Sequence, residues 1–306
     1  MPIGHFIKEI GRGKEGARHL SRESASDLMG QILDGIASDL EIGAFCLAMR
    51  IKGETTEEMC GFLDATQQRL NNIQTSPTNS RPTIVIPTYN GARKLPVLTP
   101  LLAKLLAREG FAVVMHGVAT EDQRVFTADV LKALGVMSQP TDQPVKAGDV
   151  AFFSTLHLHQ GLQRLLDVRR VVQLRNPAHS LVKLMLPCEG QQLLITSYTH
   201  PEYAVAMEQV LIARQSTALL LRGTEGEAVA DARRLPKMTG IAGGKIVVTH
   251  EHQAGALNLL PELPASCDAH TTAAYINSVL EGKVAVPKPI AVQVERVIEL
   301  ARNMSP

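Results

Sequence analysis

The feature that most constrains the fold of this chain is a single strand–loop–helix unit. The apolar, β-branched residues 83–87 predict a strand, and residues 98–108 predict a helix. Units of this kind commonly bind phosphate, because backbone N–H groups of the loop and the helix N-terminus point at the anion. A loop that wraps a diphosphate needs several glycines for close approach. This loop has only Gly91, followed by the adjacent cations Arg93 and Lys94. We therefore expect a phosphate site in which side-chain charge replaces backbone donors.

Strand-like and helix-like segments alternate through the rest of the chain. The expected strands are residues 83–87, 112–116, 150–153, 193–197, 217–221 and 245–250. The expected helices are residues 98–108, 122–134, 160–165, 201–213, 271–280 and 290–303. This alternation predicts a mainly parallel sheet that is covered on both faces.

The N-terminal part of the chain has a different pattern, with helix signals alone. Ser21 and Asp39 are suitable helix N-caps. Residues 71–82 are polar and contain two prolines, as a linker would. We therefore predict an α/β protein with a small N-terminal helical domain, residues 1–75, and a larger α/β domain, residues 76–306, with a mainly parallel sheet.

Composition limits the classes of function that the chain can have. Its 306 residues are 45% hydrophobic, so it can bury a sizeable core, and its net charge is only +1. A nucleic acid or another anion must therefore be attracted by a local patch. The four cysteines form no CxxC motif and suggest a reducing compartment. Neither a signal peptide nor an apolar run of membrane-spanning length is visible, so we expect a cytoplasmic protein with no membrane partner.

Two further segments resemble a known enzyme family. Residues 43–59 resemble the N-terminal helical domain of anthranilate phosphoribosyltransferases and pyrimidine nucleoside phosphorylases. His116-Gly117, with the helix-like run that ends at Gly135, resembles the family's histidine-glycine turn and the helix after it. The resemblance covers nearly the whole chain. It implies a helical domain beside an α/β domain, an active site in the cleft, and a homodimer formed through the helical domain.

The catalytic motifs of this family are altered here. The resemblance implies a glycine-rich loop for the diphosphate of phosphoribosyl pyrophosphate (PRPP), but residues 86–90 read Ile-Pro-Thr-Tyr-Asn. The family's magnesium-binding aspartate-glutamate pair reads Gly226-Glu227, with Glu225 as the possible second carboxylate. Arg175 matches the substrate-binding arginine. Mg²⁺ is therefore expected only if the chain is an enzyme, and otherwise no cofactor is required.

The altered motifs are themselves similar to one branch of the family. Residues 89–94, 175–179, 200–203 and 223–227, together with the basic segment 10–14, resemble the YbiB-like proteins. That branch is a paralogous group associated with nucleic-acid binding. The candidate phosphate-binding residues are Asn90, Gly91, Arg93, Lys94, Arg175, Lys183, Arg12 and Lys14. For each segment, an ordinary solvated turn or connection is the alternative.

Two functional hypotheses follow. The leading one is a homodimer that binds DNA or another nucleic acid through its phosphates, without reading base sequence. Residues 42–51 are apolar on every side, which favours a dimer, because so small a helical domain does not cover such a helix. The alternative is an active glycosyl or phosphoribosyl transferase with an unknown acceptor. A dimeric regulator that senses a nucleotide is a third possibility.

Overall fold

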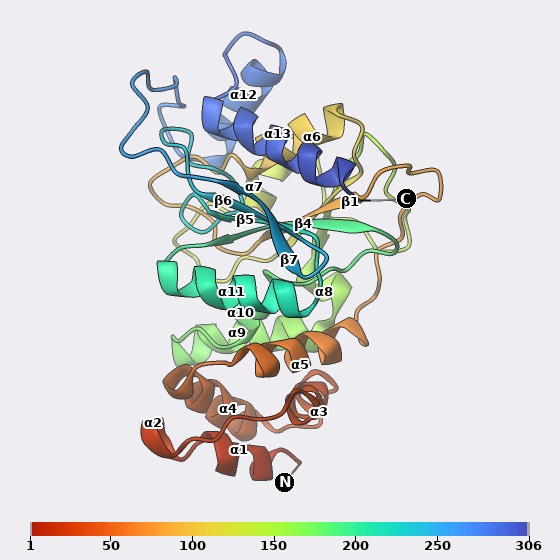
Figure 1. The fold of residues 1–306 in the computed structure, drawn as a ribbon, viewed down its shortest axis with the longest axis vertical. Coiled ribbons are helices and arrows are strands. Elements are labelled where there is room, and N and C mark those ends of the chain that lie inside the picture. The colour runs from red at the N-terminus through yellow and green to blue at the C-terminus, as the bar shows by residue number, and fades with distance from the viewer. Residues whose placement is uncertain (1, 305–306) are drawn as a thin grey trace. The chain divides into compact units, whose positions relative to one another are not determined.

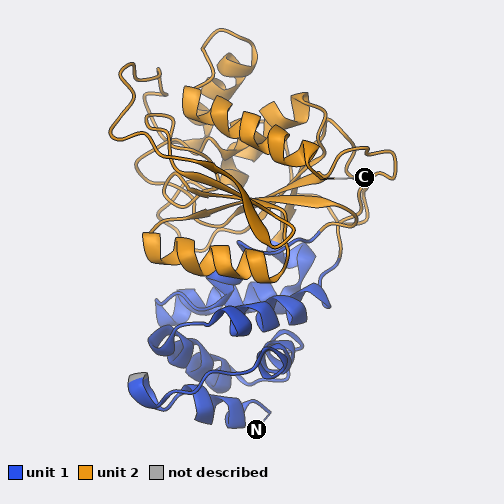
Figure 2. Cartoon of the chain, in the orientation of Figure 1, with its two compact units in different colours: residues 1–71, 155–187 blue, residues 72–154, 188–306 orange. Residues whose placement is uncertain are grey.

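The structure, a computed structural model, describes residues 2–304, with the side chain of Lys14 outside that description. The chain forms two compact units, residues 1–71 with 155–187 and residues 72–154 with 188–306 (Figure 2). The sequence predicted two continuous ranges that meet at residue 75. The structure instead adds residues 155–187, which were assigned to the α/β domain, to the N-terminal helices.

The first unit is entirely helical. Its helices are α1 (Gly4–Ile10), α2 (Gly13–Gly16), α3 (Arg22–Leu33), α4 (Asp39–Lys52), α5 (Thr56–Gln67), α8 (Thr155–Leu158), α9 (Gln160–Val172) and α10 (Ala178–Leu181). Ser21 caps α3, as predicted. The cap of α4 is Ser38 rather than Asp39, because Ser38 and Glu41 form a reciprocal capping box.

The inserted helices join this unit through apolar packing and close backbone contact. Leu162, Leu165 and Leu166 of α9 are buried, and α9 packs against α3 and α4. A Cβ atom at Gly161 would lie 2.1 Å from the carbonyl oxygen of Leu33, so only glycine permits this approach. An amphipathic helix read from sequence does not reveal which neighbour it packs against, so the sequence pattern alone did not place α9 with the N-terminal helices.

A buried ion pair fixes the junction between α4 and α5. The Lys52 ammonium donates to Glu58 Oε2 at 2.6 Å and to the Gly53 carbonyl at 2.8 Å. The other oxygen of Glu58 accepts the backbone N–H of Leu20 at 2.9 Å. Because both charged side chains are buried, these additional hydrogen bonds are needed to offset the cost of desolvation. The pair thereby ties the segment before α3 to the other two helices.

The second unit contains a seven-stranded sheet in the order β3-β2-β1-β4-β5-β6-β7. The strands are β1 (Thr83–Thr88), β2 (Val113–Gly117), β3 (Val150–Ser154), β4 (Gln192–Tyr198), β5 (Ala218–Arg222), β6 (Met238–Ala242) and β7 (Lys245–His250). Strands β1 to β5 pair in parallel, whereas β6 and β7 are antiparallel. The prediction of a mainly parallel sheet is confirmed, although β6 was not predicted.

Helices cover both faces of this sheet (Figure 1). Helix α11 (Pro201–Ala213) packs on β4, β5 and β6. On the opposite face lie α6 (Thr99–Arg108), α7 (Thr127–Ala133), α12 (Ala269–Leu280) and α13 (Lys288–Arg302). The chain runs from β1 outward to β3 and then resumes at β4 on the other side of β1. The carboxyl ends of β1 and β4 therefore form a topological switch point, where α/β sheets usually bind ligands. None of the described helices is long and apolar enough to cross a membrane.

Candidate phosphate-binding site

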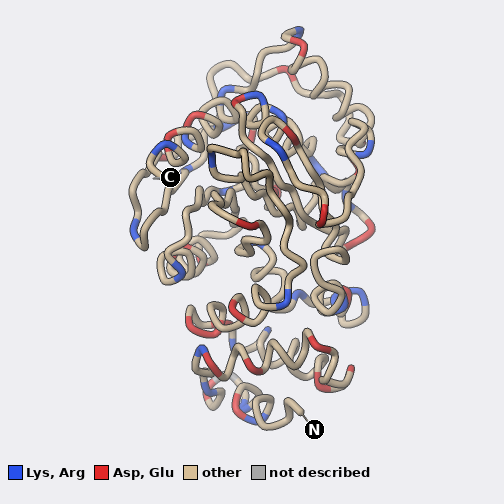
Figure 3. Tube along the Cα trace, turned by 90° about the vertical axis from the view of Figure 1, so that its right-hand side faces the viewer, with Lys and Arg blue, Asp and Glu red and all other residues tan. Residues whose placement is uncertain are grey.

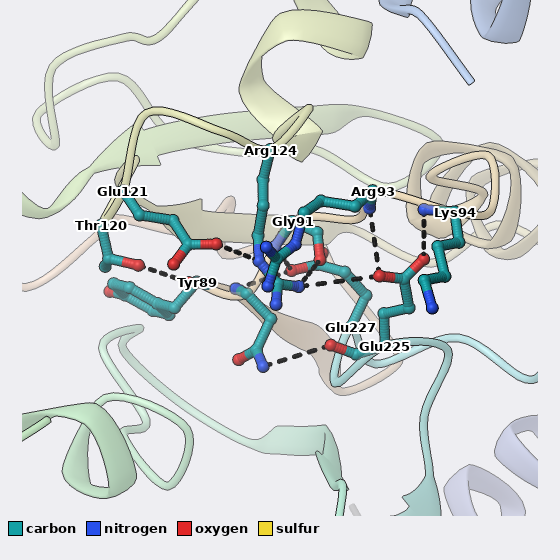
Figure 4. Close-up of polar contacts among 10 residues, drawn as sticks. Tyr89, Gly91, Arg93, Lys94, Thr120, Glu121, Arg124, Glu225 and Glu227 are labelled. Atoms are coloured by element: carbon teal, nitrogen blue, oxygen red, sulfur yellow. Dashed lines mark hydrogen bonds and ion pairs between the residues drawn. The ribbon is translucent and has the colours of Figure 1, made fainter. Parts of the chain in front are cut away.

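The candidate site lies at the carboxyl edge of the parallel strands. Three connections meet there, namely residues 89–95 after β1, residues 118–126 after β2, and residues 223–227 after β5 (Figure 4). The loop predicted from sequence is therefore at the expected place. Its neighbours are acidic as well as basic, and the acidic side chains determine its geometry.

The Glu227 carboxylate is buried under the start of the loop. Its Oε1 accepts the backbone N–H groups of Asn90 at 2.9 Å and Gly91 at 2.8 Å. Its Oε2 accepts the hydroxyl groups of Thr99 at 3.2 Å and Thr127 at 2.7 Å. A carboxylate has about four lone-pair sites for hydrogen bonds, so the protein itself uses all of them. The backbone N–H groups of Asn90 and Gly91 therefore donate to Glu227, and contact of these two residues with phosphate stays a prediction.

The Glu225 carboxylate holds the second half of the loop. It accepts three consecutive backbone N–H groups, from Arg93 at 3.1 Å, Lys94 at 2.8 Å and Leu95 at 3.0 Å. The Arg124 guanidinium lies 3.8 Å from the same carboxylate and donates to a backbone carbonyl of the loop (Figure 4). Converging N–H groups of this kind are the usual cradle for an oxyanion. Here the oxyanion is a side chain of the protein.

A tight turn delivers both glutamates to the loop. The N–H of Glu227 donates to the carbonyl of Thr224, and the two central residues, Glu225 and Gly226, have φ of +50° and +93°. These values correspond to a primed turn, in which both central residues are left-handed. A Cβ atom at Gly226 would lie 2.1 Å from Asn90 Nδ2. Glycine is therefore required at the position where the resemblance to the enzymes implies the first magnesium-binding carboxylate.

The side chains of Arg93 and Lys94 are exposed beside this closed cradle. In the described part of the chain, no carboxylate forms an ion pair with either of them; Glu225 meets only their backbone N–H groups. Arg124 and Arg233 flank the same cradle, because both interact electrostatically with Glu225. Arg233 is also paired with Asp231. Arg124 and Arg233 were not predicted from the sequence, since neither belongs to a motif and only the fold brings them here.

His116 of the histidine-glycine turn is buried beneath the loop. Its Nδ1 lies 2.8 Å from the Tyr89 hydroxyl, and the two rings meet edge to face. Complete burial lowers the pKa of His116 to about 3. His116 is therefore neutral at physiological pH and adds no charge to the site.

Arg175 and Lys183 belong to the helical unit. Arg175 lies between α9 and α10, and Lys183 follows α10. Both act on His179, whose pKa is lowered to about 3 by burial and then by Arg175, Arg169 and Lys183. The structure thus gathers these three cations around one imidazole. Arg175 and Lys183, two of the candidate phosphate-binding residues, therefore lie near each other.

The basic N-terminal segment is less available than its sequence indicates. The Arg12 guanidinium donates to Glu9 Oε1 at 2.8 Å and to the Lys8 carbonyl at 3.2 Å. Arg18 pairs with the other oxygen of Glu9 at 3.4 Å. Lys14 lies in α2, and its side chain is outside the described part of the chain. Intramolecular pairing therefore reduces the charge that Arg12 can offer a phosphate.

The two glutamates do not fit the magnesium site that was expected for an enzyme. Glu227 has no lone pair left for a metal ion, and Glu225 is held by three N–H groups and Arg124. Among the described residues, no cluster of three or more His, Cys, Asp or Glu is suited to hold a metal ion. The expected magnesium ligands are instead internal acceptors that shape the loop.

Comparison with known proteins places this arrangement in a family. Residues 5–69 match the helical bundle domain of the glycosyl transferase family. The chain is 38% identical to YbiB of Escherichia coli K12, over 96% of this chain and 92% of YbiB. It is 26% identical to the anthranilate phosphoribosyltransferase of Brevibacillus brevis, over 92% of this chain and 82% of the enzyme.

Solved structures show the same fold at lower identity. Anthranilate phosphoribosyltransferase from Thermus thermophilus aligns with a TM-score of 0.72 and 20% identity, over 97% of this chain and 89% of the enzyme. The Saccharomyces cerevisiae enzyme in complex with PRPP and Mg aligns with a TM-score of 0.69 and 14% identity, over 99% of this chain and 89% of the enzyme. Taken with the identity to YbiB over nearly the full length, these results show that the chain belongs to the YbiB-like branch of the anthranilate phosphoribosyltransferase family.

Proposed function

We propose that the protein is a homodimer that binds nucleic acid, DNA in the first instance, through phosphates and without reading base sequence. The observation that carries this proposal is the closed cradle. Glu225 and Glu227 occupy the backbone N–H groups of the loop, whereas the Arg93 and Lys94 side chains stay exposed. Side-chain cations at a surface suit the phosphodiester backbone of a nucleic acid, because they neutralise its phosphates without enclosing them.

The distribution of charge indicates that a polyanion would be attracted by local cationic patches and not by the net charge of the protein. Lys and Arg alternate with Asp and Glu along both units (Figure 3), and the net charge is only +1. In the described part of the chain, the Arg93 and Lys94 side chains form no ion pair with a carboxylate, so we expect exposed cations of this kind to determine where a polyanion binds. Arg175 and Lys183 provide a second candidate patch, in the helical unit. Aromatic residues are 4% of the chain and tryptophan is absent, so base stacking is not expected to dominate binding.

An unpartnered apolar stripe on α4 supports the dimer. Leu40, Leu47 and Ile51 are 85%, 52% and 54% exposed, and they recur on one face of the helix. The opposite face of α4 buries Phe45 and Met49 completely. Exposed leucines in such a row are typical of an interface. A second copy of α4 would cover the stripe with the same stripe, as a two-fold dimer requires.

The alternative function, a glycosyl or phosphoribosyl transferase, is supported by the similarity to the Brevibacillus brevis enzyme over most of the chain. Such an enzyme needs preorganised donors for the charge that develops on the diphosphate. In this chain the donors at the corresponding loop are already bound to carboxylates. We therefore expect no measurable transfer of a phosphoribosyl group to anthranilate with PRPP and magnesium. A turnover on the order of 1–1000 per second would favour the transferase instead.

The test of nucleic-acid binding is a double variant, Arg93→Ala with Lys94→Ala. Its affinity for duplex DNA should fall for all sequences alike. The slope of log K against log salt should flatten by about 0.9 for each phosphate that the variant no longer neutralises. The measurement is fluorescence anisotropy with random-sequence duplexes at several salt concentrations.

The matched control is Arg108→Ala with Lys146→Ala. It removes the same two charges at the end of α6 and before β3, where the parallel strands begin. Affinity and slope of this control should remain close to those of the wild type. An unchanged slope in the Arg93/Lys94 variant would show that the loop does not contact phosphate.

A further inference from the structure

We infer that Glu225 is a tethered anion that decides which phosphates this loop accepts. It excludes small diphosphates such as inorganic pyrophosphate, and it leaves only the Arg93 and Lys94 side chains for a phosphodiester chain. The statement about the phosphodiester chain rests on the proposed function. The exclusion of pyrophosphate stands on the geometry of the loop alone.

The donor set around Glu225 is that of an anion site. Three successive backbone N–H groups point at its two oxygens at 2.8–3.1 Å, and the Arg124 guanidinium lies beside them. Hydrogen bonds from a loop to an ionised group are among the stronger ones in proteins. A free diphosphate would have to displace the carboxylate to obtain them. Because Glu225 is part of the same chain, its effective concentration at the loop is high.

The backbone of Glu225 provides an independent observation. Its φ of +50° is in the left-handed region, which is unfavourable for a residue with a long side chain. Strained positions of this kind persist only where surrounding contacts fix them, and they are concentrated at functional sites. Here the turn directs the carboxylate at the loop. The strain is consistent with a residue that is placed for its contacts rather than for the turn itself.

Glu225 and Glu227 differ in what their removal would do. Glu227 is 1% exposed and lies under the loop, so its loss would disturb the packing of α6 and α7. The Glu225 side chain is 20% exposed. Two of the three residues whose N–H groups it accepts, Arg93 and Lys94, have exposed side chains. Removing Glu225 should therefore open a cradle that solvent and a small anion can reach.

The test is binding of inorganic pyrophosphate to the full chain, measured by isothermal titration calorimetry without magnesium. Glu225→Ala should bind pyrophosphate at least about ten-fold more tightly than the wild type, equivalent to about 1.4 kcal/mol. Pyrophosphate should also displace DNA from Glu225→Ala more effectively than from the wild type at equal ionic strength. Circular dichroism establishes that the variant is folded.

The matched control is Glu109→Ala, which removes the same charge from an exposed residue after α6. Glu109→Ala should bind pyrophosphate as weakly as the wild type does. The comparison separates the effect of opening the loop from the effect of a change in net charge. Glu225→Gln keeps the side-chain length and loses the charge. It should give an intermediate affinity, and it provides the test if Glu225→Ala does not fold.

One result would overturn the inference. It is a folded variant, Glu225→Ala or Glu225→Gln, whose affinity for pyrophosphate equals that of the wild type. Absence of DNA binding by the wild type would instead contradict the proposed function. The calorimetric comparison would remain valid in that case, so the two failures can be told apart.

Discussion

At the scale of single residues, the position of Gly226 explains why a carboxylate does not fit where the resemblance to the enzymes implies the first magnesium ligand. The residue needs a left-handed backbone, and its position leaves no room for a Cβ atom beside Asn90. Gly226→Asp, which rewrites the enzymes' aspartate-glutamate pair, should therefore not create a magnesium site. We expect it to lower the free energy of unfolding by about 1–3 kcal/mol. Urea denaturation and magnesium calorimetry measure the two effects.

Gly282→Asp is the matched control for this prediction. Gly282 has a similar φ of +76°, but a Cβ atom there would meet nothing within 4 Å. Gly282→Asp should therefore lose less stability than Gly226→Asp, because it introduces backbone strain but no steric clash. Tight magnesium binding by Gly226→Asp would show that the turn can rearrange, contrary to this account.

His116 leads to a prediction about pH at the same scale. Burial lowers its pKa from 6.5 to about 3 in the folded protein. Between these two values the unfolded chain binds a proton that the folded chain does not, so acid favours unfolding. The free energy of unfolding should fall by about 1.4 kcal/mol per pH unit below pH 6.5 from this residue. His179, whose pKa is also lowered to about 3, adds to the slope.

The variant that tests this effect is His116→Gln. It removes one titrating group, so its stability should depend less steeply on pH between 6.5 and 4, whatever its stability at neutral pH. Urea midpoints at several pH values provide the comparison. An identical slope in wild type and variant would mean that His116 takes up its proton in the folded protein.

At the scale of elements, the sequence was a good guide where the signal is local. The run of apolar residues that became β1 and the alternation with helices predicted the parallel sheet. The position of the loop after β1 followed from the same pattern. Local rules also placed the cap of α3 at Ser21. These features depend on neighbours within a few residues, which a single sequence displays.

The features that the sequence did not predict depend on distant contacts. Glu225 meets N–H groups 130 to 132 residues away, and a glutamate in a motif shows its charge but not its partner. Helix α9 has an ordinary amphipathic pattern that fits either unit. The sequence did contain one local signal for the turn that carries both glutamates, namely Thr-Glu-Gly-Glu at 224–227. A glycine after a polar residue favours a primed turn, and such a turn projects both glutamates from one short segment.

At the scale of the whole molecule, the cations proposed to bind DNA and the apolar stripe proposed to form the dimer lie on different surfaces. The closed cradle and its cations belong to the α/β unit, whereas the apolar stripe of α4 belongs to the helical unit. In a homodimer every cationic patch occurs twice. If both copies contact one DNA molecule, the second contact becomes intramolecular, and the affinity exceeds that of one patch. Dimerisation and DNA binding should therefore be coupled without any contact between the two surfaces.

Leu47→Glu tests this coupling. Leu47 lies at the centre of the stripe, and burial of a leucine typically contributes about 1.5–3 kcal/mol. A carboxylate there would remove that contribution and add the cost of burying a charge beside its symmetry mate. We expect the dimer to dissociate at micromolar concentration in light scattering and sedimentation, and the DNA affinity to fall at least about ten-fold.

The control is Met137→Glu, an exposed apolar residue of the α/β unit at 62% exposure. It adds the same charge to the chain, so it corrects for the weaker attraction of DNA that any new carboxylate causes. A monomeric wild type that binds DNA normally would contradict the dimer and leave the loop prediction standing. A Leu47→Glu monomer with unchanged DNA affinity would instead show that one copy of the cationic surface suffices. Because these outcomes differ, the dimer and its coupling to binding can be judged separately.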